Sequence, residues 1–127
     1  MCGIAGVIDL NGSRVHRELV LSMTEAVAHR GPDGSGVFCE DNVGLGHRRL
    51  SIIDLSEAAA QPMFYKDRFV MVYNGEVYNY PEIKSELVAI GHTFNTGSDS
   101  EVILSAYLQW GKDCVNHFNG MWAFAIY

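Results

Sequence analysis

The strand predicted over residues 2–9 is apolar on both of its faces. Ile4, Val7 and Ile8 stand among glycine and alanine residues, and residues 9–12 form a turn sequence behind them. A strand of this kind belongs in a sheet that is covered on both sides. The small residues leave room for another backbone to come close. The start of the chain therefore favours a layered fold.

Strands and helices alternate in blocks along the rest of the chain. They do not form the regular strand–helix–strand units of a parallel sheet, so we expect an α+β domain with helices over both sheet faces. The predicted strands cover 35–40, 43–53, 68–73, 92–95 and 121–127, the helices 16–29, 80–90 and 99–110, with a short helical piece at 112–118 and a loop at 54–62.

Local signals predict where some of these elements begin and end. The pair Asn74-Gly75 predicts a tight turn that ends strand 68–73, and on turn chemistry alone a hairpin is expected there. Ser98 with Glu101 is a capping box that opens helix 99–110. The apolar stripe of helix 16–29 is predicted to contain Leu19, Met23, Ala26 and Val27.

Length and charge narrow the functional classes. The 127 residues correspond to one domain, and 48% of them are hydrophobic, so a packed core is expected. The net charge of −6 argues against a nucleic acid or an anionic membrane as partner. No apolar run approaches the roughly 18 residues of a membrane helix. The last strand has no turn behind it, and we expect the natural polypeptide to continue.

The three cysteines, Cys2, Cys39 and Cys114, are far apart in the sequence. Their odd number and the lack of metal-ligand spacing favour free thiols in a reducing cytoplasm, with no metal site.

Cys2 follows the initiator methionine directly. Removal of Met1 would leave a thiol and a free α-amine on one residue. The α-amine titrates at a pKa of about 7.7–8.0, so it can accept a proton near neutrality, and a thiolate is a strong nucleophile. From position alone, the alternative that Cys2 is a small buried residue at the start of a strand stays open.

Several motifs in fixed order resemble one family. The start MCGIAG is similar to that of class II, N-terminal-nucleophile glutamine amidotransferases. The motifs HRGPDG, GHRRLSIIDLS, QPM, NGEVYNY and TGSDSEVIL resemble the glutaminase domain of glutamine-hydrolysing asparagine synthetases. The resemblance implies the four-layer αββα sandwich of N-terminal-nucleophile hydrolases over residues 1–127, incomplete at its C-terminal end. Sheet edges left unpaired by missing strands are expected to pair with another copy of the chain.

The resemblance also implies an activity. Cys2 would attack the side-chain amide of L-glutamine and form a γ-glutamyl thioester, with glutamate and ammonia as products. Ammonia would pass to aspartate activated with ATP and Mg²⁺ in a C-terminal synthetase domain that this chain lacks. The chain itself is expected to need no cofactor, and to be inactive while Met1 is retained. Two alternatives are a non-catalytic domain of the same fold and an amidotransferase with another acceptor, similar to β-lactam synthetase or polysaccharide-modifying enzymes.

The family's site residues map onto matching positions of this chain. Asn74 and Gly75 correspond to the oxyanion donors, the first through its side-chain amide and the second through its backbone N–H. Arg49 corresponds to the clamp on the substrate carboxylate, and Glu76 and Asp99 to the partners of the α-ammonium group. The backbone at Ile52 and Ile53 is expected to add hydrogen bonds.

Other charged residues near these motifs have structural alternatives. Arg48 alternates with Arg49 along a strand and is expected to face the other way, toward solvent or a lid. His29 and His47 lie at element ends, where structural hydrogen bonds are more common than catalysis. Arg30 and Asp33 are candidates for bracing the surroundings of the nucleophile.

Overall fold

The computed structural model describes residues 1–51 and 59–127. The elements, in chain order, are β1 (Gly3–Ile8), α1 (Arg17–Ala26), the 3-10 helix η1 (Ala28–Arg30), β2 (Gly34–Glu40), β3 (Val43–Arg49), β4 (Met63–Tyr65), β5 (Phe69–Val77), α2 (Tyr80–Ala89), α3 (Asp99–Trp110), the 3-10 helix η3 (Gly111–His117) and β6 (Gly120–Ile126). None of the helices among these described residues is long and apolar enough to cross a membrane.

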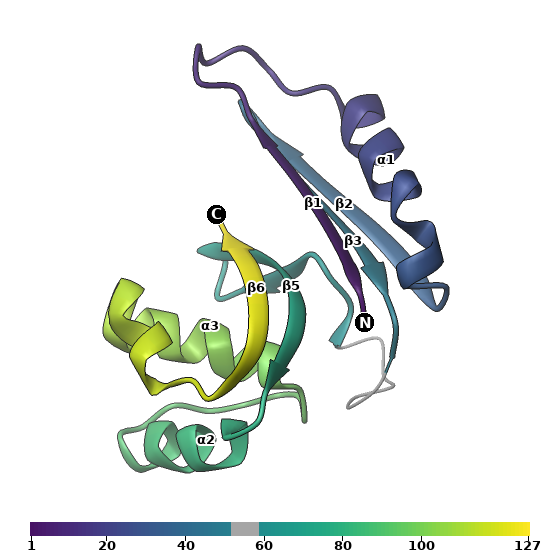
Figure 1. The fold of residues 1–127 in the computed structure, drawn as a ribbon. Coiled ribbons are helices and arrows are strands. Elements are labelled where there is room, and N and C mark those ends of the chain that lie inside the picture. Colours follow the sequence, from purple (N-terminus) through teal and green to yellow (C-terminus); the bar gives the residue numbers. More distant parts are fainter. Residues whose placement is uncertain (52–58) are drawn as a thin grey trace.

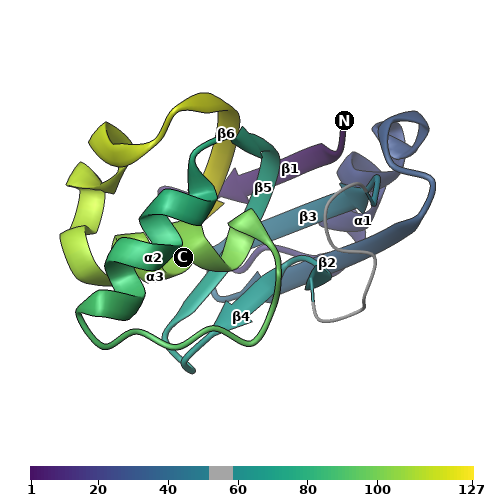
Figure 2. The ribbon, with the colours of Figure 1, turned by 90° about the horizontal axis from the view of Figure 1, so that it is seen from below.

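The described elements form four layers. One antiparallel sheet has the strand order β1-β3-β2, and a second has the order β4-β5-β6. Helix α1 covers the outer face of the first sheet, and α2 and α3 cover the outer face of the second (Figures 1 and 2). The two sheets face each other through a core of Val43, Leu45, Val70 and Val72. The predicted αββα arrangement is confirmed.

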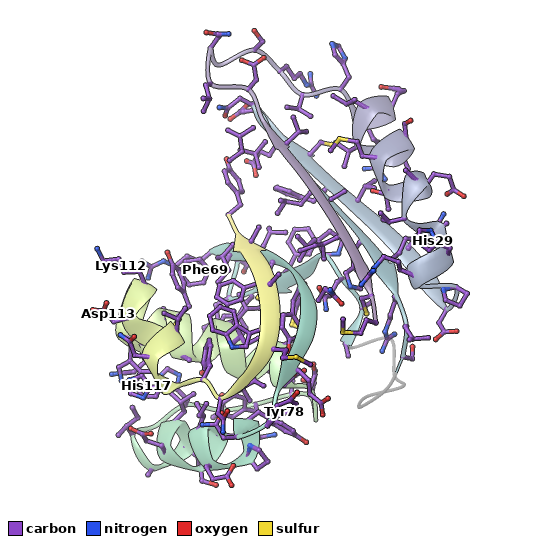
Figure 3. All side chains as sticks on the ribbon, in the orientation of Figure 1. His29, Phe69, Tyr78, Lys112, Asp113 and His117 are labelled. Carbon is purple, nitrogen blue, oxygen red and sulfur yellow. The ribbon has the colours of Figure 1, made fainter. Side chains whose placement is uncertain are left out.

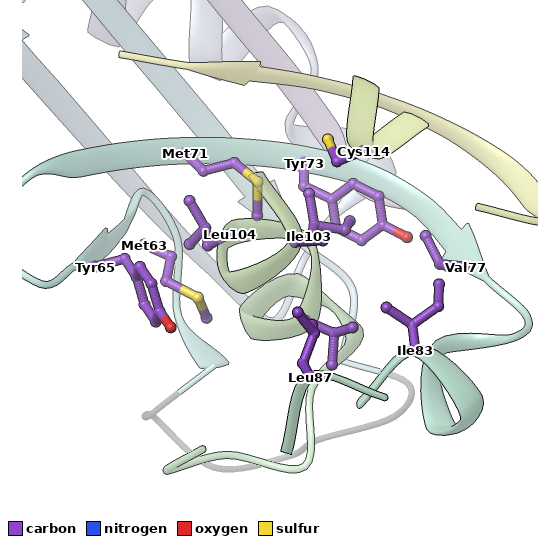
Figure 4. Close-up of a cluster of buried hydrophobic side chains, with 12 residues drawn as sticks. Met63, Tyr65, Met71, Tyr73, Val77, Ile83, Leu87, Ile103, Leu104 and Cys114 are labelled. Carbon is purple, nitrogen blue, oxygen red and sulfur yellow. The ribbon is translucent and has the colours of Figure 1, made fainter. Parts of the chain in front are cut away.

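Strand β5 is central because its two faces serve two different cores. Val70 and Val72 face the first sheet, whereas Met71, Tyr73 and Val77 pack on the helical side. Figure 4 shows these three with the buried side chains of α2 and α3. This period of two is the alternation expected of a strand buried on both faces.

The predicted turn at Asn74-Gly75 is wrong, because β5 runs through both residues to Val77. The backbone angle φ of Gly75 is +151°, a value that L side chains rarely adopt. β6 pairs with this part of β5, and Gly75 lies opposite Trp122. Pairing with a strand almost fifty residues away therefore overrides the local turn signal.

The apolar stripe predicted for the first helix is shifted by one residue. The fully buried side chains of α1 are those of Val20 and Thr24, whereas Leu19 is 49% exposed. The reason lies on β3: a Cβ atom at Gly44 would overlap Val20, and one at Gly46 would overlap Thr24. The two glycines thus leave the space that this face of the helix fills. The helix also ends at Ala26, three residues early, and continues as η1.

The remaining differences between the predicted and the observed elements involve short segments. β3 ends at Arg49, and residues 52–58 lie outside the described part. β4 was not predicted. Residues 92–95 are not a strand, and the N–H groups of Asn95 and Thr96 donate to the Glu101 carboxylate of α3. Ser98 caps α3 by accepting from the N–H of Ser100 at 3.0 Å. The predicted capping box with Glu101 is not formed, because the N–H of Ser98 donates to Oγ1 of Thr96 instead.

Candidate active site

A cleft opens where six parts of the chain meet: the N-terminus, the end of β3, the segment before β4, the second half of β5, the start of α3 and the start of β6. Its lining includes every predicted site residue that the structure describes, namely Cys2, Arg49, Asn74, Gly75, Glu76 and Asp99. The predicted Ile52 and Ile53 lie outside the described residues. Residues separated by almost one hundred positions in sequence thus share one cavity.

Cys2 is half-buried and directly precedes β1. Its Sγ atom lies 3.3 Å from the backbone N of Leu50, which donates to it, and 3.5 Å from the carbonyl oxygen of the same residue. Arg30 donates from Nε to the carbonyl oxygen of Cys2 over 2.9 Å. The sulfur atom of Cys2 is therefore held by the backbone of Leu50, and the carbonyl group of Cys2 is held by Arg30.

Asp33 contributes to the segment that carries Leu50. Its backbone N–H donates to the carbonyl oxygen of Arg49 at 2.9 Å, and its Oδ2 accepts from the N–H of Ser51 at 2.8 Å. Arg30 and Asp33, which the sequence offered only as candidates for this role, thus both brace the backbone around the thiol.

The register of β5 with β6 determines where its backbone groups point. Val70 and Tyr127 exchange both backbone hydrogen bonds, and the N–H of Tyr78 donates to the carbonyl oxygen of Asn119. Antiparallel partners alternate between bonding each other and pointing their polar groups outward. Even-numbered residues of β5 therefore bond β6, and odd-numbered residues point their N–H groups away from it.

Side chains occupy two of those outward N–H groups. The N–H of Tyr73 donates to Oε1 of Gln61 at 2.6 Å, and the N–H of Val77 donates to Oδ2 of Asp99 at 3.1 Å. Gly75 lies between them, and by the same alternation its N–H points to the same side. Since Gly75 lines the cleft, its geometry suits a hydrogen-bond donor to a ligand held there.

Asn74 and Glu76 alternate with Gly75 on β5. They have the parity of Val70 and Val72, so their side chains lie on the face of β5 that is turned toward the first sheet. Oδ1 of Asn74 is buried and has no hydrogen-bond partner among the described residues. Glu76 is exposed at the rim. Both lie on the side of the strand from which Cys2 enters the cleft.

The charged residues of the cleft are distributed between its walls. Arg49 is half-buried at the end of β3, and Asp99 is buried as the first residue of α3. The N-terminal end of a helix favours a carboxylate.

Arg48 faces the opposite side from Arg49, as predicted, but its side chain is only 17% exposed and forms an ion pair with Glu25 of α1. Solvent is therefore not its main partner.

The two histidines of interest differ in position. His47 is buried, and its Nε2 lies 3.2 Å from the carbonyl oxygen of Tyr73, which joins the two sheets. Burial, with the nearby charge of Arg49, lowers the pKa of His47 to about 4, so the ring is neutral at pH 7. His29 is exposed beside α1 (Figure 3) and is not part of the cleft lining.

Sequence reasoning assigned no site role to several residues of the cleft wall. Tyr73 and Gln61 are the main ones, and both form hydrogen bonds at the edge of β5. Their signals were present, since Tyr73 directly precedes Asn74 and Gln61 begins the QPM motif. The other residues of the lining are Met1, His47, Leu50, Ser51, Ala59, Tyr78, Ser98, Ser100 and Met121.

Known proteins resemble this chain over its whole length. It is 44% identical over 131 residues to "Asparagine synthetase [glutamine-hydrolyzing] 3" of Bacillus subtilis, covering 100% of this chain and 21% of that protein. It is 41% identical to "Asparagine synthetase B [glutamine-hydrolyzing]" of Escherichia coli, with 100% and 23% covered. The chain thus spans about a fifth of the length of these relatives.

A solved structure shares the fold. The glutamine phosphoribosylpyrophosphate amidotransferase of B. subtilis superimposes with a TM-score of 0.78 at 19% identity, covering 100% of this chain and 35% of that one. The family described as "Glutamine amidotransferase domain" matches residues 1–127. This chain belongs to the family of glutamine amidotransferase domains.

Proposed function

We propose that this chain is the glutaminase half of an asparagine synthetase, which releases ammonia from the side-chain amide of L-glutamine. One observation carries the proposal: a half-buried thiol, a cation and a buried carboxylate line a single cleft, through Cys2, Arg49 and Asp99. It is supported by the relatives, which are named as glutamine-hydrolysing asparagine synthetases.

The chemistry would begin at Cys2 after loss of Met1. The α-amine accepts the thiol proton, sulfur attacks the amide carbon, and a tetrahedral intermediate forms. The intermediate collapses as the protonated amine gives its proton to the leaving ammonia, which leaves a γ-glutamyl thioester. Water then attacks the thioester with the amine as base, and glutamate and the free thiol are formed.

The oxygen of the tetrahedral intermediate needs donors. We assign this role to the Gly75 N–H, which points away from β6 on the cleft side, and to the side-chain amide of Asn74. Removing one such donor in other acyl-transfer enzymes lowers the rate by about 10²–10³. A continuous strand that is held by β6 suits this role, because the donor needs no reorganisation when charge develops.

Recognition of free glutamine requires opposite charges set apart. Arg49 would bind the α-carboxylate, since a guanidinium can donate two parallel hydrogen bonds to it. Asp99 and Glu76 would accept from the α-ammonium group. Ile52 and Ile53 are proposed to add backbone hydrogen bonds to the substrate.

Met1 lines the same cleft as Cys2. While it is present, the nitrogen of Cys2 is a peptide amide that cannot act as a base. Removal of Met1 would therefore both create the base and clear the cavity, and we propose that only the processed chain is active.

The fate of the ammonia is a further part of the proposal. The relatives are about four to five times longer than this chain, which supports a C-terminal synthetase domain that would use ATP and Mg²⁺ to activate aspartate. The free thiols of Cys2, Cys39 and Cys114 suit a reducing cytoplasm as its location.

The experiment measures ammonia release from L-glutamine by the natural polypeptide, after its intact mass has established loss of Met1. Cys2→Ala is the control and should show no turnover. Processed, folded protein with no thiol-dependent ammonia release would overturn the proposal. Supplying ATP, Mg²⁺ and aspartate and assaying asparagine then tests the acceptor, and ammonia release without asparagine formation would contradict that part.

A further inference from the structure

The hydroxyl of Tyr73 lies 2.7 Å from Oδ2 of Asp99 and donates to it. Tyr73 is 3% exposed in the core between β5 and α3, and Figure 4 shows its hydroxyl pointing toward the Val77 end of β5. The N–H of Val77 donates to the same carboxylate oxygen at 3.1 Å. Two donors from one strand therefore occupy Oδ2.

This arrangement limits how the carboxylate can turn. Asp99 is the first residue of α3, and a carboxylate there could also rotate to cap the N–H groups of its own helix. With Oδ2 held by Tyr73 and Val77, the plane of the carboxylate is fixed. Its second oxygen, Oδ1, is then the one that can accept from a ligand in the cleft that Asp99 lines.

Tyr73 is itself anchored at two further points. Its N–H donates to Oε1 of Gln61 at 2.6 Å, and its carbonyl oxygen lies 3.2 Å from Nε2 of His47. Its phenol ring and its peptide groups are thus held by three separate parts of the fold. Asn74, which follows directly, shares that anchored backbone.

We propose that Tyr73 is a positioning residue that makes the cleft selective for the α-ammonium group of an amino-acid substrate, by holding the Asp99 carboxylate in the orientation that receives it. This inference rests on the proposed function, because it takes Asp99 as the ammonium acceptor. Burial, reinforced by the hydrogen bond to Asp99, raises the pKa of the Tyr73 hydroxyl far above its usual value, so the hydroxyl stays a donor.

The test is a binding measurement in the natural polypeptide with Cys2→Ala, so that no ligand is consumed. Tyr73→Phe should weaken the affinity for L-glutamine about tenfold, the size of one hydrogen bond to a charged group. The second ligand is 4-carbamoylbutanoate, which equals glutamine without its α-ammonium group. Its affinity should be the same with and without Tyr73→Phe.

Tyr65→Phe is the matched control. Tyr65 is also buried, 6% exposed, but its hydroxyl has no partner among the described residues (Figure 4 labels both tyrosines). This variant should leave both affinities unchanged. With Cys2 restored, Tyr73→Phe should raise the KM for glutamine and leave kcat within about twofold, since the hydroxyl contacts no reacting atom.

The outcomes separate the two proposals. Equal losses of affinity for both ligands, or a fall in kcat with KM unchanged, would make Tyr73 a general structural residue and overturn the inference. Unchanged glutamine affinity in Tyr73→Phe would overturn it too. If the protein binds glutamine with the expected dependence on Tyr73 but releases no ammonia, the inference stands and the proposed glutaminase activity fails.

Discussion

Arg30 donates from Nε to the carbonyl oxygen of Cys2 across 2.9 Å, and so ties η1 to the residue that carries the thiol. The contact fixes the peptide that follows Cys2, while Leu50 holds the sulfur atom from the other side. The orientation of the thiol is therefore set by two segments distant in sequence. Small displacements of a reacting group can cost about 10² in rate.

Replacing Arg30 with alanine should lower kcat for glutamine hydrolysis about tenfold and change KM less than twofold. The reason is that the arginine touches the backbone of Cys2 and not the substrate. Arg17→Ala is the control, because Arg17 is an exposed arginine that donates to the carbonyl oxygen of Val37, away from the cleft. Steady-state kinetics of both variants decide the matter, and equal kcat values would contradict the role of Arg30.

Gly75→Ala should destabilise the fold by about 2–4 kcal/mol, measured by urea unfolding. A Cβ atom there would overlap the carbonyl oxygen of Met121 and lie 2.5 Å from Cα of Trp122, and φ is +151°. Gly34→Ala is the control in β2, where the nearest atom would be 3.8 Å away, and we expect a change within about 1 kcal/mol. A loss in Gly75→Ala as small as that expected for Gly34→Ala would contradict this and would mean that β6 moves to accommodate the added methyl group.

The sequence was enough to predict which residues meet, but not the path of the strand that carries two of them. The motifs containing Cys2, Arg49 and Asp99 are each continuous, and all three residues line the cleft. The predicted turn at Asn74-Gly75 was wrong because the conformation of these residues depends on pairing with β6. That pairing is a long-range contact that no local pattern encodes. The same Gly75 that looked like a turn residue serves a strand that has no room for a side chain.

The prediction of which face of α1 is buried was wrong for a related reason. Periodicity detects a helix, but the face that is buried depends on the surface that receives it. Here the receiving strand β3 has Gly44 and Gly46, and the helix places Val20 and Thr24 over them. The glycines on β3 therefore determine that Val20 and Thr24 are buried and that the larger Leu19 is left partly exposed. The binding contributions assigned to Ile52 and Ile53 remain predictions.

Tyr65 and Tyr73 should respond in opposite ways to removal of the hydroxyl. Tyr73→Phe loses a hydrogen bond to a carboxylate and should cost about 1.5–3 kcal/mol of unfolding free energy. Tyr65→Phe removes a buried hydroxyl without a partner among the described residues, so stability should stay equal or rise by about 1 kcal/mol. Chemical unfolding of both variants checks this, and equal destabilisation would show that Tyr65 has a bonding partner.

His47 should give the fold a pH dependence between pH 6.5 and 4. Burial lowers the pKa of His47 from 6.5 to about 4 in the folded state, so the unfolded chain binds a proton more readily. The resulting stability is fully present above pH 6.5 and is lost as the pH falls toward 4. Between pH 7 and pH 5 this one group should account for about 2 kcal/mol.

His47→Gln isolates that contribution, because the glutamine amide does not titrate and can still donate toward the carbonyl oxygen of Tyr73. The unfolding free energy of the wild type should fall between pH 7 and pH 5 by about 2 kcal/mol more than that of His47→Gln. His29→Gln, which removes an exposed histidine, is the control. Parallel pH profiles for the wild type and His47→Gln would mean that His47 accepts a proton inside the folded protein, and its place between the two sheets would then have to open to solvent.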